Sequence, residues 1–317
     1  MTPPFAHHVP VLSDRVFALL APALTSPGCV LVDATVGLGG HADHALRTFP
    51  SIRLVGIDRD QSALDAARDR LAKWHGRITL VHAVYDEIPQ VLRTLGIECA
   101  DGILFDLGVS SMQLDDPERG FSYSIDAPLD MRMNPQDPLT AAVIVNEYAE
   151  EDIRRVLRDF GEERFASRIA RGIVRAREST PILQSSQLVD IVRDCIPAPA
   201  RRTGGNPAKR TFQALRIEVN GELITLRRAI PAALEVLGIG GRMVVLSYQS
   251  LEDRIVKQVF SSSTSSGVPE DLPFVPEGSA PSYRLLTRGA EKASAIEVSD
   301  NPRAASVRLR AIERVAA

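Results

Sequence analysis

Residues 33–41 bring carboxylate, glycine and histidine side chains together in a short run, DATVGLGGH. The run follows an apolar segment that is typical of a strand and precedes a segment with helical spacing. Its glycines permit positive φ angles and close approach of the backbone to a ligand, and a helix start offers unpaired N–H groups. Asp58 ends the next apolar segment, 21 positions after Gly37, where a carboxylate can bind both hydroxyls of a ribose. The pattern predicts a site for an adenosine-containing cofactor.

The order of the glycines favours one cofactor over others. Dinucleotide-binding folds usually have G-x-G-x-x-G against a pyrophosphate, whereas residues 37–40 here have G-x-G-G. Asp33 and Asp106, each at the end of an apolar segment, supply negative charge that suits the ammonium and sulfonium groups of S-adenosylmethionine. We therefore predict S-adenosylmethionine as the cofactor. An NAD-dependent oxidoreductase, a non-catalytic RNA-binding factor with the same fold, and a tight turn in which Asp58 only caps a helix are the alternatives.

The segments around this run predict the elements that position it. Short apolar, β-branched segments alternate with segments of helical spacing, such as the one from Leu64 to Trp74. Strands that alternate with helices form a parallel sheet with helices on both faces. The predicted strands are residues 29–36, 51–58, 77–83, 100–107 and 242–247, with a further strand near 283–287.

The middle of the chain has a different pattern, with no strand-like segment from about 140 to 200. Helical spacing marks three amphipathic helices, around 153–160, 165–173 and 188–195. A loop rich in Pro and Gly follows, and then a helical stretch to about Leu237 with a break or kink at Pro231. We predict a discontinuous sheet domain, residues 1–135 and 215–317, and an all-helical insertion, residues 136–214.

Charge is distributed unevenly between these parts. The whole chain has a formal net charge of -3, but residues 151–230 carry 16 Lys and Arg against 10 Asp and Glu, a net charge of +6. The positive sign of the helical part indicates a polyanionic partner such as RNA. The alternative is a set of solvated helix faces with pairs such as Glu151–Arg155. Aromatic residues make up only 5% of the chain, which disfavours a surface built on base stacking.

Several kinds of site are disfavoured by what the sequence contains. Cys29, Cys99 and Cys195 are far apart, so neither a disulfide framework nor a zinc site is predicted. His41 and His44 have helical spacing, but no further residue completes a metal-ligand set with them. The sequence shows no signal peptide and no apolar run long enough to span a membrane, so we predict a cytoplasmic protein.

Several longer runs closely resemble the ribosomal RNA small subunit methyltransferase H family of bacteria. The similarity extends from His8 to about Arg310. The runs that carry it are DATVGLGGH at 33–41, DLGVSSMQLD at 106–115, RGFS at 119–122, DAPLDMRM at 126–133, KRTFQALR at 209–216, SLEDR at 250–254 and NPR at 301–303.

The resemblance implies a fold, a reaction and a set of cofactor contacts. Members have a Rossmann-like methyltransferase sheet with a helical insertion. They transfer a methyl group from S-adenosylmethionine to the exocyclic N4 of a cytosine in the decoding region of small-subunit (16S) ribosomal RNA. The implied partner is ribosomal RNA, predicted to be within the assembled subunit, with no membrane involved and a homodimer left open. The implied cofactor contacts are Gly39, Gly40, His41, Asp58, Tyr85, Asp106 and Gln113.

The chain departs from the family pattern at two places. Tyr85 stands where many members have Phe, and either ring could cover an adenine. Tyr248-Gln249 stand where many members have Phe-His, so we do not expect a catalytic histidine there.

The residues that act on the substrate are predicted less directly. Asp106 or a nearby backbone carbonyl is the candidate acceptor for the hydrogen of the cytosine amino group. The segment 250–253 could be catalytic or could simply begin a helix, and Phe121 and Tyr123 could stack on a base or pack a lid. Phosphate contacts are predicted at Lys209, Arg210 and Arg216, with a solvated helix start as the alternative. Further phosphate contacts are predicted at Arg303, Arg308 and Arg310, with a solvated strand or tail as the alternative.

Overall fold

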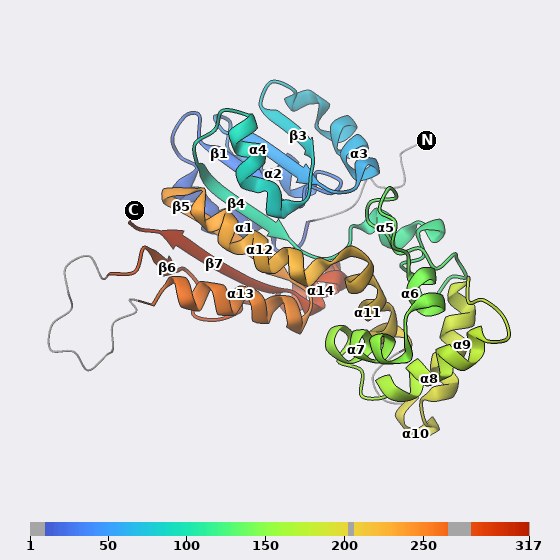
Figure 1. Cartoon of the computed structure of the whole chain (residues 1–317). Coiled ribbons are helices and arrows are strands. Elements are labelled where there is room, and N and C mark those ends of the chain that lie inside the picture. Colours follow the sequence, from blue (N-terminus) through green and yellow to red (C-terminus); the bar gives the residue numbers. More distant parts are fainter. Residues whose placement is uncertain (1–9, 202–205, 266–279, 317) are drawn as a thin grey trace, which may run out of the picture. The chain divides into compact units, whose positions relative to one another are not determined.

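The computed structural model describes residues 10–201, 206–265 and 280–316 (Figure 1). The chain divides into two compact units. The sheet unit comprises Met1–Gly108 and Ile224–Ala317, and the helical unit comprises Val109–Leu223.

The sheet unit contains seven strands in the order β3-β2-β1-β4-β5-β7-β6. Strands β1 to β5 are parallel, whereas β7 is antiparallel to β5 and β6 is antiparallel to β7. This confirms the predicted Rossmann-like α/β fold, with the order reversing between β1 and β4. The strands are β1 Val30–Asp33, β2 Arg53–Asp58, β3 Ile78–His82, β4 Ala100–Asp106, β5 Leu237–Ser247, β6 Tyr283–Leu285 and β7 Arg308–Arg314.

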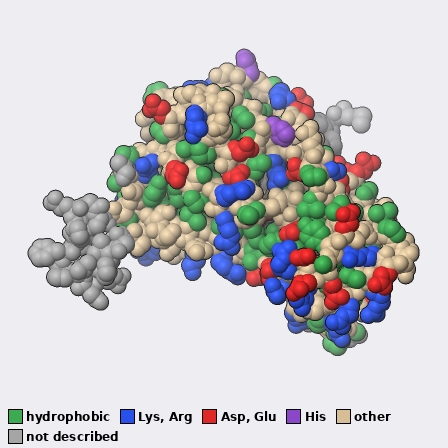
Figure 2. All heavy atoms as spheres, viewed as in Figure 1, with side chains coloured by type: hydrophobic (Ala, Val, Ile, Leu, Met, Phe, Trp, Pro, Cys, Tyr) green, Lys and Arg blue, Asp and Glu red, His purple; other side chains and the backbone are tan. Residues whose placement is uncertain are grey.

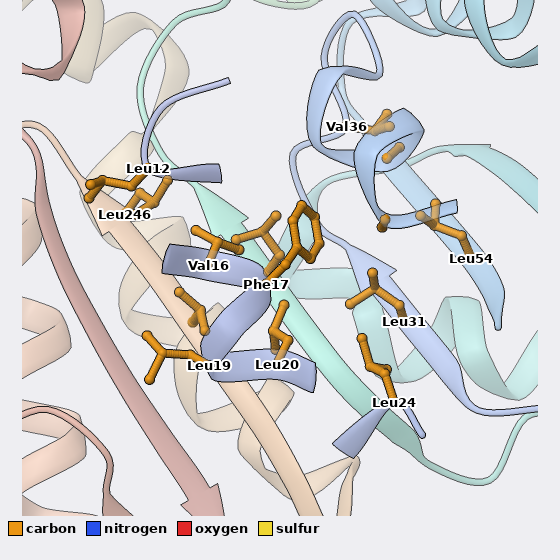
Figure 3. Close-up of a cluster of buried hydrophobic side chains, with 14 of the residues drawn as sticks. Leu12, Val16, Phe17, Leu19, Leu20, Leu24, Leu31, Val36, Leu54 and Leu246 are labelled. Carbon is orange, nitrogen blue, oxygen red and sulfur yellow. The ribbon is translucent and has the colours of Figure 1, made fainter. Parts of the chain in front are cut away.

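Helices cover both faces of the sheet, which is why its central strands are apolar throughout. Successive residues of β4 point to opposite faces, so Leu104 joins the core beneath α1 whereas Phe105 faces the other side. Figure 3 shows Val16, Phe17 and Leu20 of α1 in that core. The helices of this unit are α1 Ser13–Leu20, α2 Gly40–Thr48, α3 Gln61–Leu71, α4 Ile88–Thr94, α12 Glu222–Glu235, α13 Ser250–Ser263 and α14 Ala295–Asp300.

Two features of this unit differ from the sequence prediction. A strand at β7 was expected only as the alternative to phosphate contacts, because its RLRAIER sequence is rich in charge. In the structure both Arg308 and Arg310 pair with Asp253 of α13, so a phosphate would have to compete with that carboxylate. The break in the helical stretch before Leu237 lies at Gly221, which has a φ of 58°, and α12 continues through Pro231. Gly221 adopts the left-handed conformation that ends a helix at low cost, so the helical stretch breaks there and not at Pro231, while a kink at Pro231 stays a prediction.

The helical unit is built around amphipathic helices, as the spacing predicted. Helix α7 buries Ile153, Val156 and Leu157, and α8 buries Ile169 and Ile173. No helix in the described part of the chain is both long and apolar enough to cross a bilayer. The helices of this unit are α5 Ser111–Asp115, α6 Ala141–Glu147, α7 Glu150–Gly161, α8 Ala166–Arg177, α9 Ser185–Cys195, α10 Ala198–Arg201 and α11 Lys209–Asn220.

The helical unit has wider bounds than the predicted insertion, because residues 109–135 pack onto the helices. Phe121, Leu129 and Met131 belong to the same buried cluster as the faces of α7 and α8. The buried side chain of Asn220 on α11 accepts a hydrogen bond from the N–H of Met133 and donates one to the carbonyl of Met131. A buried amide satisfied by backbone groups fixes this segment against α11.

Candidate active site

The loop between β1 and α2 depends on glycine at two positions. Gly37 and Gly39 have positive φ angles of 50° and 75°, and Gly39 is the N-cap of α2. A Cβ atom on Gly39 would lie 2.8 Å from Cδ1 of Leu71, and one on Gly40 would lie 2.9 Å from Cγ of Pro10. Gly39 and Gly40, the two glycines predicted as cofactor contacts, therefore also allow the start of α2 to pack closely against Leu71 and Pro10.

Asp58, at the end of β2, holds this loop in place. One of its carboxylate oxygens accepts a hydrogen bond of 2.8 Å from the N–H of Gly37, and the other accepts one of 2.9 Å from the N–H of Asp60. Asp60, and not Asp58, is the N-cap of α3, because its side chain accepts a hydrogen bond from the N–H of Ser62. Burial raises the pKa of Asp58 to about 6, although the two N–H donors oppose that shift.

Asp33 and His41 lie on either side of the glycine loop. Asp33 is almost fully buried, and this burial raises its pKa to about 7, although the charge of His41 acts in the opposite direction. Neither ring nitrogen of His41 has a hydrogen-bond partner among the described residues, although both are buried. Its Nε2 lies 3.5 Å from Oδ2 of Asp106. A buried imidazole with both nitrogens unsatisfied is costly unless a ligand supplies a partner.

Asp106, at the end of β4, is held by two contacts. Its N–H donates a hydrogen bond of 2.7 Å to Oγ1 of Thr35, which ties the end of β4 to the glycine loop. The hydroxyl of Tyr248, at the end of β5, donates a hydrogen bond of 2.7 Å to Oδ1 of Asp106. Burial, followed by the charge of Asp106, raises the pKa of Tyr248 well above its usual value, so this hydroxyl remains a donor. The side chain of Asp106 is 25% exposed, and its Oδ2 accepts no hydrogen bond from a described residue.

The segment 250–253 has a structural role. Glu252 accepts hydrogen bonds from the N–H groups of Tyr248 and Gln249 and so caps the start of α13. Asp253 is almost fully buried and is paired with Arg308 and Arg310, as described above. These contacts favour the helix-start interpretation over the catalytic one.

Tyr85 and Gln113 belong to different units. Tyr85 follows β3 in the sheet unit, and its ring meets Phe105 edge-on with 5.8 Å between the ring centroids. Gln113 lies in the helical unit, where its side chain accepts a hydrogen bond from the N–H of Ser110 and is 4% exposed. The sheet unit thus brings together six of the seven predicted cofactor contacts at the carboxyl ends of its strands.

Comparison with known proteins identifies the family. A model of the MraW methylase family matches residues 5–315. The chain belongs to the MraW methylase family. Among its relatives, the proteins called ribosomal RNA small subunit methyltransferase H in Nocardioides sp. and Frankia alni are each 62% identical to it. The first match covers 97% of this chain and 96% of the relative, and the second covers 98% and 95%. The resemblance drawn from the sequence runs is therefore confirmed.

As a member of the MraW methylase family, the chain is an S-adenosylmethionine-dependent methyltransferase, and its residues fit that cofactor. Asp58 has the position that binds ribose hydroxyls in such folds, and Tyr85 offers an aromatic ring. Buried carboxyls whose pKa is raised, Asp33 to about 7 and Asp58 to about 6, become ionised more readily beside a cation. The ammonium and sulfonium groups supply that positive charge, and the unsatisfied nitrogens of His41 offer further polar contacts.

The residues predicted to contact phosphate, and the histidine considered as a metal ligand, lie outside this group of cofactor contacts. Lys209, Arg210 and Arg303 are exposed, in keeping with their predicted phosphate contacts. The guanidinium of Arg216 forms two hydrogen bonds, of 2.8 and 2.9 Å, with the carboxylate of Glu222, so a phosphate would have to compete with that pair. His44 binds Oγ of Ser13, and the described residues contain no group of three His, Cys, Asp or Glu that could hold a metal ion.

Two residues of the site escaped sequence reasoning. Thr35 lies inside the glycine run but carries no signal of a contact with β4. Tyr248 was noted only as a departure from the family pattern, and its position after an apolar strand was the one available signal that it belongs to the site.

The raised pKa of Asp33 predicts how the stability of the cofactor-free chain depends on pH. Because that pKa is about 7 in the folded chain and 3.8 for an ordinary aspartate, the folded state holds a proton that the unfolded state releases. The stabilisation is complete below about pH 4 and is lost as the pH rises to about 7. We expect Asp33 to lower the free energy of unfolding by about 2 kcal/mol between pH 5 and pH 7.5, measured by urea denaturation.

In Asp33→Asn the free energy of unfolding should decrease less over the same pH interval, because the asparagine side chain does not titrate. Asp14→Asn is the matched control, since Asp14 is exposed on α1, and it should behave like the parent chain. If the free energy of unfolding of Asp33→Asn falls as much between pH 5 and pH 7.5 as that of the parent chain, Asp33 is not the group that causes the decrease.

Proposed function

We propose that this chain methylates the exocyclic N4 of a cytosine in the decoding region of small-subunit (16S) ribosomal RNA. The proposal rests on the family membership and on the names of relatives that share 62% identity over almost the whole chain. The observation that carries the chemistry is Asp106, a partly exposed carboxylate whose Oδ1 accepts a hydrogen bond from Tyr248, and whose Oδ2 lies 3.5 Å from Nε2 of His41 and accepts no hydrogen bond from a described residue. The proposed substrate is the assembled subunit, which implies a cytoplasmic location; a homodimer stays a prediction.

Oδ2 of Asp106 could assist the amino nitrogen of cytosine, which is a weak nucleophile. The lone pair of the cytosine amino group is delocalised into the ring, so the nitrogen is a weak nucleophile. When bound, S-adenosylmethionine supplies a methyl group on a positively charged sulfur. As the N–C bond forms and the C–S bond breaks, the amino nitrogen must lose one proton. Oδ2 of Asp106 is placed to accept a hydrogen bond from that amino group and to favour its pyramidal form.

The positions of the cysteines disfavour the covalent route used for ring-carbon methylation. Cys29 directly precedes β1 and Cys99 directly precedes β4. Both therefore lie at the amino ends of parallel strands, whereas Asp33 and Asp106 lie at the carboxyl ends. Cys195 belongs to the helical unit. No cysteine of the sheet unit's described residues is thus at the carboxyl-end edge that holds the site.

The aromatic residues after α5 are engaged in packing. Phe121 is 6% exposed and belongs to the core of the helical unit, and Tyr123 meets Phe212 of α11 edge-on at 5.9 Å. These contacts favour the interpretation that this segment packs as part of the helical unit. The target base still has to leave its stack to reach a methyltransferase site.

The test of the proposed function is the chemical identity of the product. The chain is incubated with S-adenosylmethionine and small ribosomal subunits that lack the methyl group, and their nucleosides are then analysed by mass spectrometry. We expect N4-methylcytidine. A different methylated nucleoside would overturn the substrate assignment, and binding of NADH in place of S-adenosylmethionine by calorimetry would overturn the cofactor.

Removing the charge of Asp106 should slow the reaction without removing the cofactor site. We expect Asp106→Asn to lower kcat by about 100-fold or more, the contribution typical of a positioned proton acceptor, while the chain still binds S-adenosylmethionine in calorimetry. Asp101→Asn is a matched control, because Asp101 lies at the other end of β4 and binds the N–H of Val30. Full turnover by Asp106→Asn with the cofactor bound would rule out Asp106 as the acceptor.

Tyr248 should act as a positioning residue through Asp106. We expect Tyr248→Phe to lower kcat by about threefold to tenfold, because the carboxylate loses the donor that fixes its orientation, with little change in KM for either substrate. The control is Tyr283→Phe, which removes a hydroxyl bound to the carbonyl of Leu234 elsewhere in the same unit. If both variants change kcat equally, the effect is one of general stability and not of positioning.

A further inference from the structure

The arginines of α8 differ from the other charged side chains of the helical unit. The helix has the sequence ASRIARGIVRAR, with four arginines and no acidic residue. Three of them, Arg168, Arg171 and Arg175, are exposed. With 3.6 residues per turn, these three lie within about 60° around the helix and within about 10 Å along it. They form one face, which we call the arginine face of α8.

This face is supported by a rigid helix. Ile169, Ala170 and Ile173, on the opposite side of α8, are completely buried in the core of the unit. Gly172 lets Cys195 of α9 pack directly against the helix, because a Cβ atom there would collide with its sulfur. A helix fixed in this way presents its side chains at constant spacing and does not have to be ordered on binding.

The charge of this face is little neutralised within the unit. Among the described residues, Arg168 and Arg175 form no ion pair, and Arg171 reaches only Glu150, at 3.9 Å. The neighbouring helix α7 is the opposite case, because Arg154 pairs with Glu151 at 2.8 Å and Arg158 with Asp159 at 2.7 Å. In Figure 2, the basic side chains (blue) and acidic side chains (red) of the helical unit are intermingled on the face that is shown. The two helices therefore carry similar numbers of arginines but different net charge.

The geometry points to the phosphate backbone of ribosomal RNA as the occupant of the arginine face, an inference that rests on the proposed function. We propose that Arg168, Arg171 and Arg175 contact successive phosphates of the small-subunit RNA. Guanidinium groups bind phosphate oxygens through paired N–H donors. An anionic membrane is a poorer fit, because α8 buries its whole apolar side and exposes no large hydrophobic side chain.

The test compares two charge-matched sets of substitutions in the full chain. One variant combines Arg168→Gln, Arg171→Gln and Arg175→Gln, and the other combines Arg154→Gln, Arg155→Gln and Arg158→Gln on α7. Affinity for a fluorescently labelled 16S ribosomal RNA transcript is measured by anisotropy over a range of KCl concentrations. Circular dichroism and S-adenosylmethionine calorimetry check that each variant is folded.

The arginine-face variant should bind about tenfold or more weakly, and the slope of log K against log salt should become shallower by about 2, since each phosphate contact contributes about 0.7–0.9. The α7 variant should change the slope by less than about 1. A third variant, with lysine at the three positions of α8, should keep most of the slope because it keeps the charge. If the triple glutamine variant does not fold, the single variants Arg168→Gln, Arg171→Gln and Arg175→Gln take its place, and each should make the slope shallower by about 0.7–0.9; unchanged slopes in all three would overturn the inference.

Several outcomes would overturn the inference. Unchanged binding by the arginine-face variant, or an equal loss in both glutamine variants, would remove this face as a specific contact. Loss of binding to anionic phospholipid vesicles without loss of RNA binding would assign it to a membrane. A parent chain that binds the transcript through this face but forms no N4-methylcytidine would overturn the proposed function alone, and unchanged RNA binding with correct methylation would overturn this inference alone.

Discussion

The site depends on hydrogen bonds that join the carboxyl ends of neighbouring strands. Asp58 at the end of β2 binds the glycine loop after β1 through the N–H of Gly37, and Thr35 in that same loop binds the N–H of Asp106 at the end of β4. The loop is therefore fixed on both sides. Because parallel strands end at the same edge, these two contacts also bring three carboxylates to one place. Burial is the main cause that raises the pKa of Asp33 and of Asp58, and the charges of Asp106 and Asp58 add to the shift of Asp33.

The two units contribute different electrostatics to one reaction. The sheet unit collects buried carboxylates around the place of a cationic cofactor. The helical unit as a whole carries 16 Lys and Arg against 18 Asp and Glu, a net charge of -2, and the arginines of α7 are paired with acidic residues of the same helix. The net charge of a unit therefore does not show where it is positive, since residues 151–230 carry +6 while residues 109–150 carry 2 Lys and Arg against 8 Asp and Glu. The relevant property is which charged groups lack a partner, and this depends on contacts between helices.

Local patterns in the sequence were sufficient for the parallel sheet and the glycine loop, because strand periodicity and the positive φ of glycine are local properties. They failed where the outcome depended on a distant partner. Strand β7 alternates arginine with apolar residues and is stable because Asp253, more than fifty positions earlier, pairs with Arg308 and Arg310. The predicted pair Glu151–Arg155 is another example, because Arg155 lies nearest Asp152 and Glu218 while Glu151 binds Arg154. Likewise, nothing near residues 109–135 indicates that Asn220 will bind their backbone.

Tyr248 illustrates how one hydroxyl group can change the role of a position without changing the fold. A phenyl ring at the end of β5 would fill the same buried space, but it could not donate to Asp106. With the hydroxyl present, Oδ1 accepts a hydrogen bond and Oδ2 faces Nε2 of His41 at 3.5 Å, so the carboxylate is held in one orientation. The next residue, Gln249, has its backbone N–H bound by Glu252 at the start of α13. The proton acceptance that we propose thus depends on a carboxylate oriented by a neighbouring strand, and it uses no histidine after β5.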